Sequence, residues 1–247
     1  MRFTVLGACG AWPSAGEACS GFLVEHDGFR LLLDLGYATV PRLLSRVPAE
    51  QVDAVFVSHG HPDHCADLNP LLRARTLGGR SPSRLPVYAP AGALEAVMRL
   101  DRPGMLDDAY MVHEVVPGAL FELGPFRAET RLLPHWEPNV GIRLIADGRV
   151  LAYTGDTGPS RDVVGLARDA DLLLAEATYP DHVPDHSRQY LSSARTAGRQ
   201  AAEAGADHLL LTHLWPGTDP QIALAMAAET YDGALDVAVS DFTIDLA

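Results

Sequence analysis

The chain has 247 residues, 47% of them hydrophobic, which is enough for one large α/β domain with a substantial core. The net charge of −13 disfavours a long polyanionic partner such as RNA, because the overall field repels it unless a local basic patch dominates. No apolar run reaches the ~20 residues that span a bilayer, and the N-terminus lacks the long apolar core of a secretory signal. The three cysteines, an odd number without C-x-x-C spacing, argue against a disulfide framework. We therefore expect residues 1–247 to form one cytoplasmic domain.

Short strand-like runs dominate the first part of the chain. The predicted strands cover residues 2–7, 21–26, 29–36 and 53–59. A helix is predicted at residues 40–47, and further helices at 66–76 and 91–100. The one concentration of positive charge is a group of arginines, Arg73, Arg75, Arg80 and Arg84. A solvated arm is the first interpretation of this group, and a substrate-binding role is the alternative.

The second part of the chain repeats this order of strands followed by helices. Strands are predicted at residues 110–116, 119–124, 126–133, 140–147 and 149–156, and the last two read as a hairpin. The remaining segments alternate between helices at residues 161–168, 192–205 and 219–233 and strands at 170–178, 206–213 and 236–246. This order predicts two β-sheets packed together with helices on their outer faces.

The stretch "VSHGHPDHCADL" places His59, His61, Asp63 and His64 within six residues, directly after an apolar strand. A solvated turn would not require three imidazoles and a carboxylate at such a place, so the pattern predicts metal binding. Residues two apart in an extended loop point to one side, so His59 and His61 can bind one ion. Asp63 and His64, beyond Pro62, can face a second ion.

Other strands also end in side chains able to bind metal. His135, Asp156 and His213 each follow a predicted strand, and the rigid strand ends can bring them to one point. Imidazole and carboxylate without thiolate suit Zn²⁺, with Mn²⁺ and Fe²⁺ as alternatives. The two oxygens of Asp156 can bridge two ions, and a pair of ions ~3.5–4 Å apart holds a reactive hydroxide between them. We therefore expect two divalent metal ions.

Together, these residues resemble the metallo-β-lactamase superfamily, whose H-x-H-x-D-H signature is found here at residues 59–64. The resemblance covers essentially the whole chain and implies a four-layer αββα sandwich. It also implies one metal held by His59, His61 and His135, a second held by Asp63, His64 and His213, and Asp156 shared by both. Asp34, in "LLLDLG", would support the ligands from behind.

Within the superfamily the chain is similar to the phosphodiesterase branch, which includes ribonuclease Z, and to small bacterial cyclic-nucleotide phosphodiesterases. Glu176, in "LLLAEATY", matches an acidic position of that branch. Two departures are visible. The short interval between His135 and Asp156 has no room for the substrate-gripping arm common in ribonuclease Z. Tyr190 occupies the position at which the branch usually has a histidine. In that branch the histidine and the glutamate together protonate or position the leaving group.

The resulting expectation is a phosphodiesterase that cleaves a small nucleotide-type diester, such as a cyclic nucleotide, by a metal-bridging hydroxide. Its expected catalytic residues are Asp63, Glu176, Tyr190 and His186, with Tyr190, His186 or a metal-bound water as the proton donor. Three alternatives stay open: a transfer-RNA 3′ endonuclease of the ribonuclease Z type, a thioester, lactone or carboxylic-ester hydrolase, and a metal-binding protein without turnover. The expected partners are a small-molecule substrate and a second copy in a homodimer, with no membrane and no nucleic acid.

Overall fold

The chain begins with an antiparallel meander of three strands, β1 (Arg2–Gly7), β2 (Gly21–His26) and β3 (Phe29–Leu35). The computed structural model describes residues 1–79 and 82–246. Asp27 and Gly28 join β2 to β3 with φ angles of 48° and 79°, and such left-handed two-residue turns match the twist of the strands that they connect. The strands are apolar on both faces because one face meets a second sheet and the other meets helices.

The described strands form two sheets of seven strands each. The first sheet has the order β14-β1-β2-β3-β4-β5-β6 and adds β4 (Ala54–Phe56), β5 (Leu85–Ala89), β6 (Tyr110–Glu114) and β14 (Thr243–Asp245). The second sheet has the order β13-β12-β11-β10-β9-β8-β7. Its strands are β7 (Leu120–Leu123), β8 (Phe126–Leu133), β9 (Asn139–Ala146), β10 (Arg149–Tyr153), β11 (Leu172–Glu176), β12 (His208–Thr212) and β13 (Ala234–Val237).

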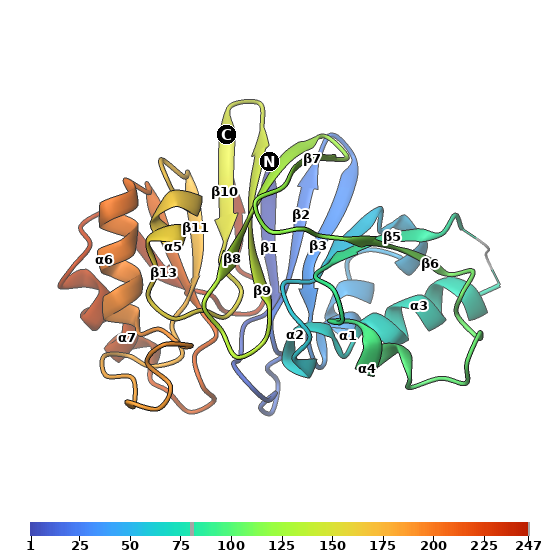
Figure 1. The fold of residues 1–247 in the computed structure, drawn as a ribbon, viewed down its shortest axis with the longest axis horizontal. Coiled ribbons are helices and arrows are strands. Elements are labelled where there is room, and N and C mark those ends of the chain that lie inside the picture. The colour runs from blue at the N-terminus through green and yellow to red at the C-terminus, as the bar shows by residue number, and fades with distance from the viewer. Residues whose placement is uncertain (80–81, 247) are drawn as a thin grey trace.

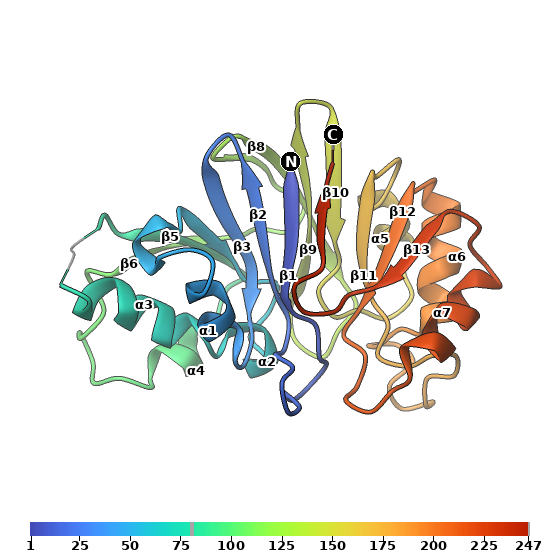
Figure 2. The same cartoon turned by 180° about the vertical axis from the view of Figure 1, so that it is seen from behind.

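Helices cover the outer face of each sheet (Figures 1 and 2). On the first sheet lie α1 (Thr39–Leu44), α2 (Pro62–Cys65), α3 (Leu68–Leu77) and α4 (Glu95–Met98), with a short 3-10 helix at Ala49–Gln51. On the second sheet lie α5 (Arg161–Leu166), α6 (Ala194–Ala204) and α7 (Pro220–Ala228). A central core that includes Phe22, Phe56 and Tyr153 fills the space between the sheets, and a separate core lies under each helical layer. The predicted four-layer αββα sandwich is confirmed.

Two segments differ from the sequence-based expectation. β5 was not predicted, because it is short and contains Pro86, which weakens a strand pattern. The single strand expected at residues 236–246 is two strands in different sheets: β13 pairs with β12, and β14 pairs with β1. Asp241, with a φ of 71°, lies in the connection between them. The C-terminal segment therefore links the two sheets at their edges.

The arginine group does not form a free basic patch within the described residues. Arg75 is buried and donates to the carbonyl oxygens of Ala49 and Val52. Arg73 pairs with Asp101 and Arg84 with Asp108, while Arg80 lies outside the described residues. Each described member therefore has a structural partner. No helix among residues 1–79 and 82–246 is long and apolar enough to cross a membrane.

The topology brings several strand ends to one edge of the sandwich. β3, β4, β5 and β6 are parallel in the first sheet, and β10, β11, β12 and β13 are parallel in the second. The carboxyl ends of parallel strands meet at the same edge of a sheet, so the loops after β4, β10 and β12 lie near one another. These loops carry six of the predicted ligands, and the seventh, His135, follows β8, which runs in the same direction as β10 because both are antiparallel to β9.

Candidate metal centre

Local structure fixes the orientation of the loop that follows β4. Pro62 is at the first position of α2, where a proline is favoured because no backbone donor is needed there. His61 precedes this helix, and Asp63 and His64 lie within it. The left-handed backbone of His213, with a φ of 64°, is held by a hydrogen bond from its N–H to the carbonyl of Ala8 at 3.0 Å. Both loops therefore hold their side chains in defined directions.

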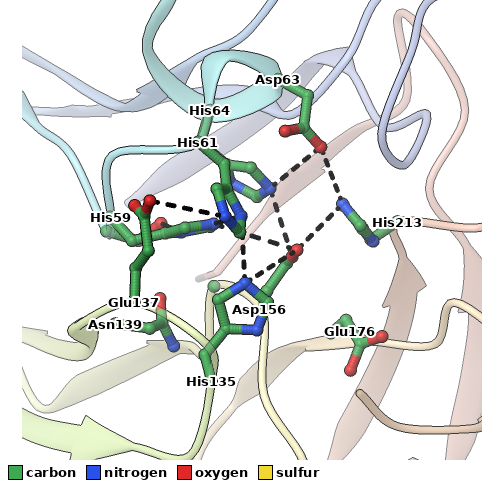
Figure 3. A network of polar contacts seen from close by, with 12 residues as sticks. His59, His61, Asp63, His64, His135, Glu137, Asn139, Asp156, Glu176 and His213 are labelled. Atoms are coloured by element: carbon green, nitrogen blue, oxygen red, sulfur yellow. Dashed lines mark hydrogen bonds and ion pairs between the residues drawn. The ribbon is translucent and has the colours of Figure 1, made fainter. Parts of the chain in front are cut away.

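The first cluster consists of His59, His61, His135 and Asp156, whose ligand atoms all lie within 4.8 Å of one another (Figure 3). Nε2 of His59 and Nε2 of His135 each lie 3.1 Å from Nδ1 of His61. Oδ2 of Asp156 lies 4.0 Å from His59 and 3.9 Å from His135. Three imidazole nitrogens and a carboxylate oxygen thus face one point.

The second cluster consists of Asp63, His64, Asp156 and His213. Nε2 of His213 lies 3.1 Å from Oδ2 of Asp63 and 3.2 Å from Oδ2 of Asp156. Nε2 of His64 lies 3.2 Å from Oδ1 of Asp156. Asp156 belongs to both clusters, at the centre of the network in Figure 3. All seven predicted ligands are brought together in the arrangement that the resemblance implied.

Four of the imidazoles are held from behind through Nδ1, which leaves Nε2 facing the centre. The partners of Nδ1 are Ser58 Oγ for His59 (3.0 Å), Asp34 Oδ2 for His64 (2.7 Å), the Tyr190 carbonyl for His135 (2.9 Å) and Thr178 Oγ1 for His213 (2.9 Å). Metal-binding histidines in proteins are held in this way, because the outer bond fixes the ring and its tautomer.

Two buried polar atoms at the centre of the clusters lack a hydrogen-bond partner among the described residues and could instead bind a cation. Nε2 of His64 and Oδ1 of Asp156 are buried, yet neither makes a hydrogen bond of acceptable geometry within the described chain. Buried polar atoms are normally satisfied, so such a pair at the centre of a ligand cluster indicates a missing partner. The donor set of imidazole and carboxylate suits divalent ions such as Zn²⁺.

Charge supports the same conclusion. Burial, reinforced by the nearby His64, lowers the pKa of His59 well below its ordinary value, so this ring is neutral, as a metal ligand must be. Burial opposes protonation of His64 and His213 as well, but the carboxylates of Asp156 and Asp63 outweigh it and raise the pKa of both rings. When both rings are neutral, as metal ligands must be, the carboxylates of Asp63 and Asp156 leave this cluster with negative charge that a cation would offset.

The remaining predicted catalytic residues, Glu176, Tyr190 and His186, differ in burial and in their partners. Glu176 is buried, and its carboxylate accepts hydrogen bonds from the backbone N–H groups of Thr178 (3.0 Å) and Ser192 (2.6 Å). Burial, together with the charge of Asp156, raises the pKa of Glu176 to about 8. The ring of Tyr190 packs on Trp136, and His186 is exposed on the loop before Tyr190. The Glu176 carboxylate thus holds the backbone at Thr178 and at Ser192. The ring of Tyr190 contacts an indole, and the side chain of His186 is exposed to solvent.

Several supporting residues escaped the sequence analysis. Ser58 and Thr178 bind the outer nitrogens of two ligands, and the hydroxyl of Tyr153 donates to Oδ2 of Asp34 at 2.6 Å. Ser58 directly precedes His59, which is a usable signal for a supporting role. Tyr153 offers no such signal, because its partner lies 119 positions away in the chain.

Gly36 allows the close approach of the helix that carries two ligands. A Cβ atom at Gly36 would lie 1.8 Å from the carbonyl oxygen of Asp63, so Gly36→Ala must displace α2. We expect this variant to lose about 3 kcal/mol of unfolding free energy, as overpacked sites do, and to bind metal more weakly. Denaturant unfolding and metal titration measure both effects. Gly165→Ala, in α5 with its nearest neighbour at 3.5 Å, is the control and should be neutral or slightly stabilised.

Comparison with known proteins shows the family to which this chain belongs. The model of the "Beta-lactamase superfamily domain" matches residues 19–214. The chain is 33% identical to the probable metallo-hydrolase YhfI of Bacillus subtilis over 98% of both chains. The crystal structure of YhfI superposes with a TM-score of 0.90, at 30% identity and 98% coverage of each chain. A ribonuclease Z of Haloferax volcanii is 30% identical, with 96% of this chain and 92% of that protein covered. This chain therefore belongs to the metallo-β-lactamase superfamily, in its ribonuclease Z-like branch of hydrolases.

Proposed function

We propose that this protein is a phosphodiesterase that cleaves a small nucleotide-type diester, such as a cyclic nucleotide, with two divalent ions, Zn²⁺ being the first candidate. The supporting observation is the pair of ligand clusters joined by the shared carboxylate of Asp156. When bound, two such ions supply a hydroxide at neutral pH and offset the charge of a phosphate.

The residues of this chain orient the imidazole rings and determine the side from which substrate can reach the metal site. The outer hydrogen bonds to His59, His64, His135 and His213 fix the direction of each ring before substrate arrives, which avoids reorganisation during the reaction. The side chain of His61 is 31% exposed, whereas those of the other ligands are nearly or fully buried. We infer that substrate approaches from the side of His61.

The surroundings of this opening favour a compact substrate. The carboxylate of Glu137 lies 3.8 Å from His61 and is half-exposed, so it adds negative charge at the entrance. The interval between His135 and Asp156 is filled by the β9–β10 hairpin, which turns at Asp147 and Gly148. A long polyanion would meet repulsion there and no arm to hold it. These features rank a small diester above a transfer-RNA precursor.

A substrate panel tests this proposal. Protein reconstituted with Zn²⁺, Mn²⁺ or Fe²⁺ is assayed with cyclic nucleotides, bis(p-nitrophenyl) phosphate, a transfer-RNA precursor, and thioester and lactone substrates. We expect hydrolysis of the small phosphodiesters, abolished by a chelator and restored by the metal. Cleavage of the precursor alone would favour the transfer-RNA endonuclease. Turnover confined to carboxylic esters would replace the phosphodiesterase assignment.

A further inference from the structure

All three tryptophans of the chain lie next to the metal centre and are exposed to solvent. Trp136 directly follows the ligand His135 and is 51% exposed. Trp12 is 48% exposed and follows Ala11, whose N–H donates to Asp63 at 2.8 Å. Trp215, two positions after His213, is 36% exposed. Indole rings are usually among the most buried side chains, so three exposed ones around one site indicate a binding surface.

The exposed rings form two groups, one beside each ligand cluster. Trp136 packs on Tyr190 with ring centroids 5.1 Å apart, and its ring also lies 5.2 Å from that of His135. On the other side, the ring of Trp215 lies 5.8 Å from that of Trp12 and 5.1 Å from that of Tyr179. The first group is attached to the first cluster and the second group to Asp63 and His213. Aromatic side chains therefore flank the centre.

The first of these groups, Trp136 with Tyr190, lies on the side from which substrate is expected to approach. His61 is the most exposed ligand, and its ring centroid is 4.9 Å from that of His135, on which Trp136 packs. The ring of Tyr190 contacts the indole, and the Tyr190 backbone carbonyl also contacts Nδ1 of His135. The exposed indole is thus fixed to the site on two sides.

Glu137, half-exposed and 3.8 Å from His61, adds negative charge at the entrance, which disfavours a further anionic group on the organic part of the substrate. A flat, uncharged ring avoids this cost and can stack on an indole. Stacking of one base on one aromatic side chain strengthens binding by roughly 5- to 150-fold.

We propose that Trp136, supported by Tyr190, stacks on the purine or pyrimidine base of the substrate while its phosphate lies at the metal centre. This inference rests on the proposed function and identifies Trp136 as the residue that selects substrates with a base. Trp136 acts through binding, so its loss raises KM and leaves kcat close to that of the unmodified protein.

The test compares a ligand that has a base with one that lacks it. Calorimetry on the metal-loaded protein measures Kd for AMP and for ribose 5-phosphate. We expect AMP to bind about 10-fold more tightly, and Trp136→Ala to remove that difference while ribose 5-phosphate binds unchanged. Trp136→Phe should keep most of it. Leu77→Ala, an exposed apolar side chain at the end of α3, is the control and should keep all of it.

Other outcomes are decisive as well. Equal binding of AMP and ribose 5-phosphate by the unmodified protein, or an unchanged ratio in Trp136→Ala, overturns the stacking role. If Trp136→Ala does not fold, Trp136→Leu keeps the apolar volume without the aromatic face and gives the same comparison. The substrate panel reports separately on the proposed function, because a protein that stacks AMP but hydrolyses no phosphodiester contradicts only that proposal.

Discussion

Asp156→Asn is expected to lower metal content to well under one ion per chain and phosphodiester hydrolysis by more than about 100-fold. Asp156 is the one side chain shared by both clusters, with oxygens within 4.0 Å of Nε2 of His59, His135, His64 and His213. Even residues one contact away from a metal change affinity or activity by roughly 10- to 100-fold, so a shared ligand should exceed that range. An amide has one weakly coordinating oxygen, and its NH₂ group would face ring nitrogens.

Elemental analysis and hydrolysis of bis(p-nitrophenyl) phosphate measure the two effects. Asp147→Asn is the matched control, because Asp147 lies in a third group of possible ligands with His26 and Asp27 but is exposed. Its left-handed φ of 49° is one that asparagine tolerates. We expect this variant to keep full metal content and activity. Normal metal content in Asp156→Asn would show that the two clusters do not depend on a shared carboxylate.

The two side-chain clusters could be predicted from the sequence because their members either lie in one short motif or follow an apolar strand. His59, His61, Asp63 and His64 lie within six residues, and short loops limit where their side chains can point. His213 follows an apolar strand whose end is rigid. The hydrogen-bond partners behind the ligands depend on how distant strands align, and no local pattern specifies that alignment. Their identity required the three-dimensional structure.

For the fold as well, some strands could be recognised from the local sequence, whereas others depend on pairing with distant strands. Apolar runs such as β3 and β11 are recognisable because both of their faces are buried. The division of residues 236–246 into β13 and β14 depends on which sheet edge each half meets. β5 combines a short length with Pro86, and its parallel neighbours β4 and β6 stabilise it. Tertiary pairing therefore decides the elements that propensity leaves ambiguous.

Asp34→Asn is expected to combine a large loss of stability with weaker metal binding. Oδ1 of Asp34 accepts a hydrogen bond from the Ser58 N–H at 2.7 Å. Oδ2 accepts from the Ser58 hydroxyl and the Tyr153 hydroxyl and contacts Nδ1 of His64, all within 2.7 Å. Asparagine has one acceptor oxygen, so buried donors are left unsatisfied at a cost of about 1–3 kcal/mol each. We expect a total loss of about 3–5 kcal/mol.

Metal affinity should fall by roughly 10- to 100-fold in the same variant, because His64 loses the partner that orients its ring. Denaturant unfolding of the metal-free protein and metal titration separate the two effects. Tyr153→Phe removes one donor to the same carboxylate and should cost about 1 kcal/mol with metal affinity retained. Full metal affinity in Asp34→Asn would contradict the role of Asp34 in orienting His64, whatever the stability. The left-handed φ of 56° at Asp34 suits asparagine, so the measured losses would report on the carboxylate and not on backbone strain.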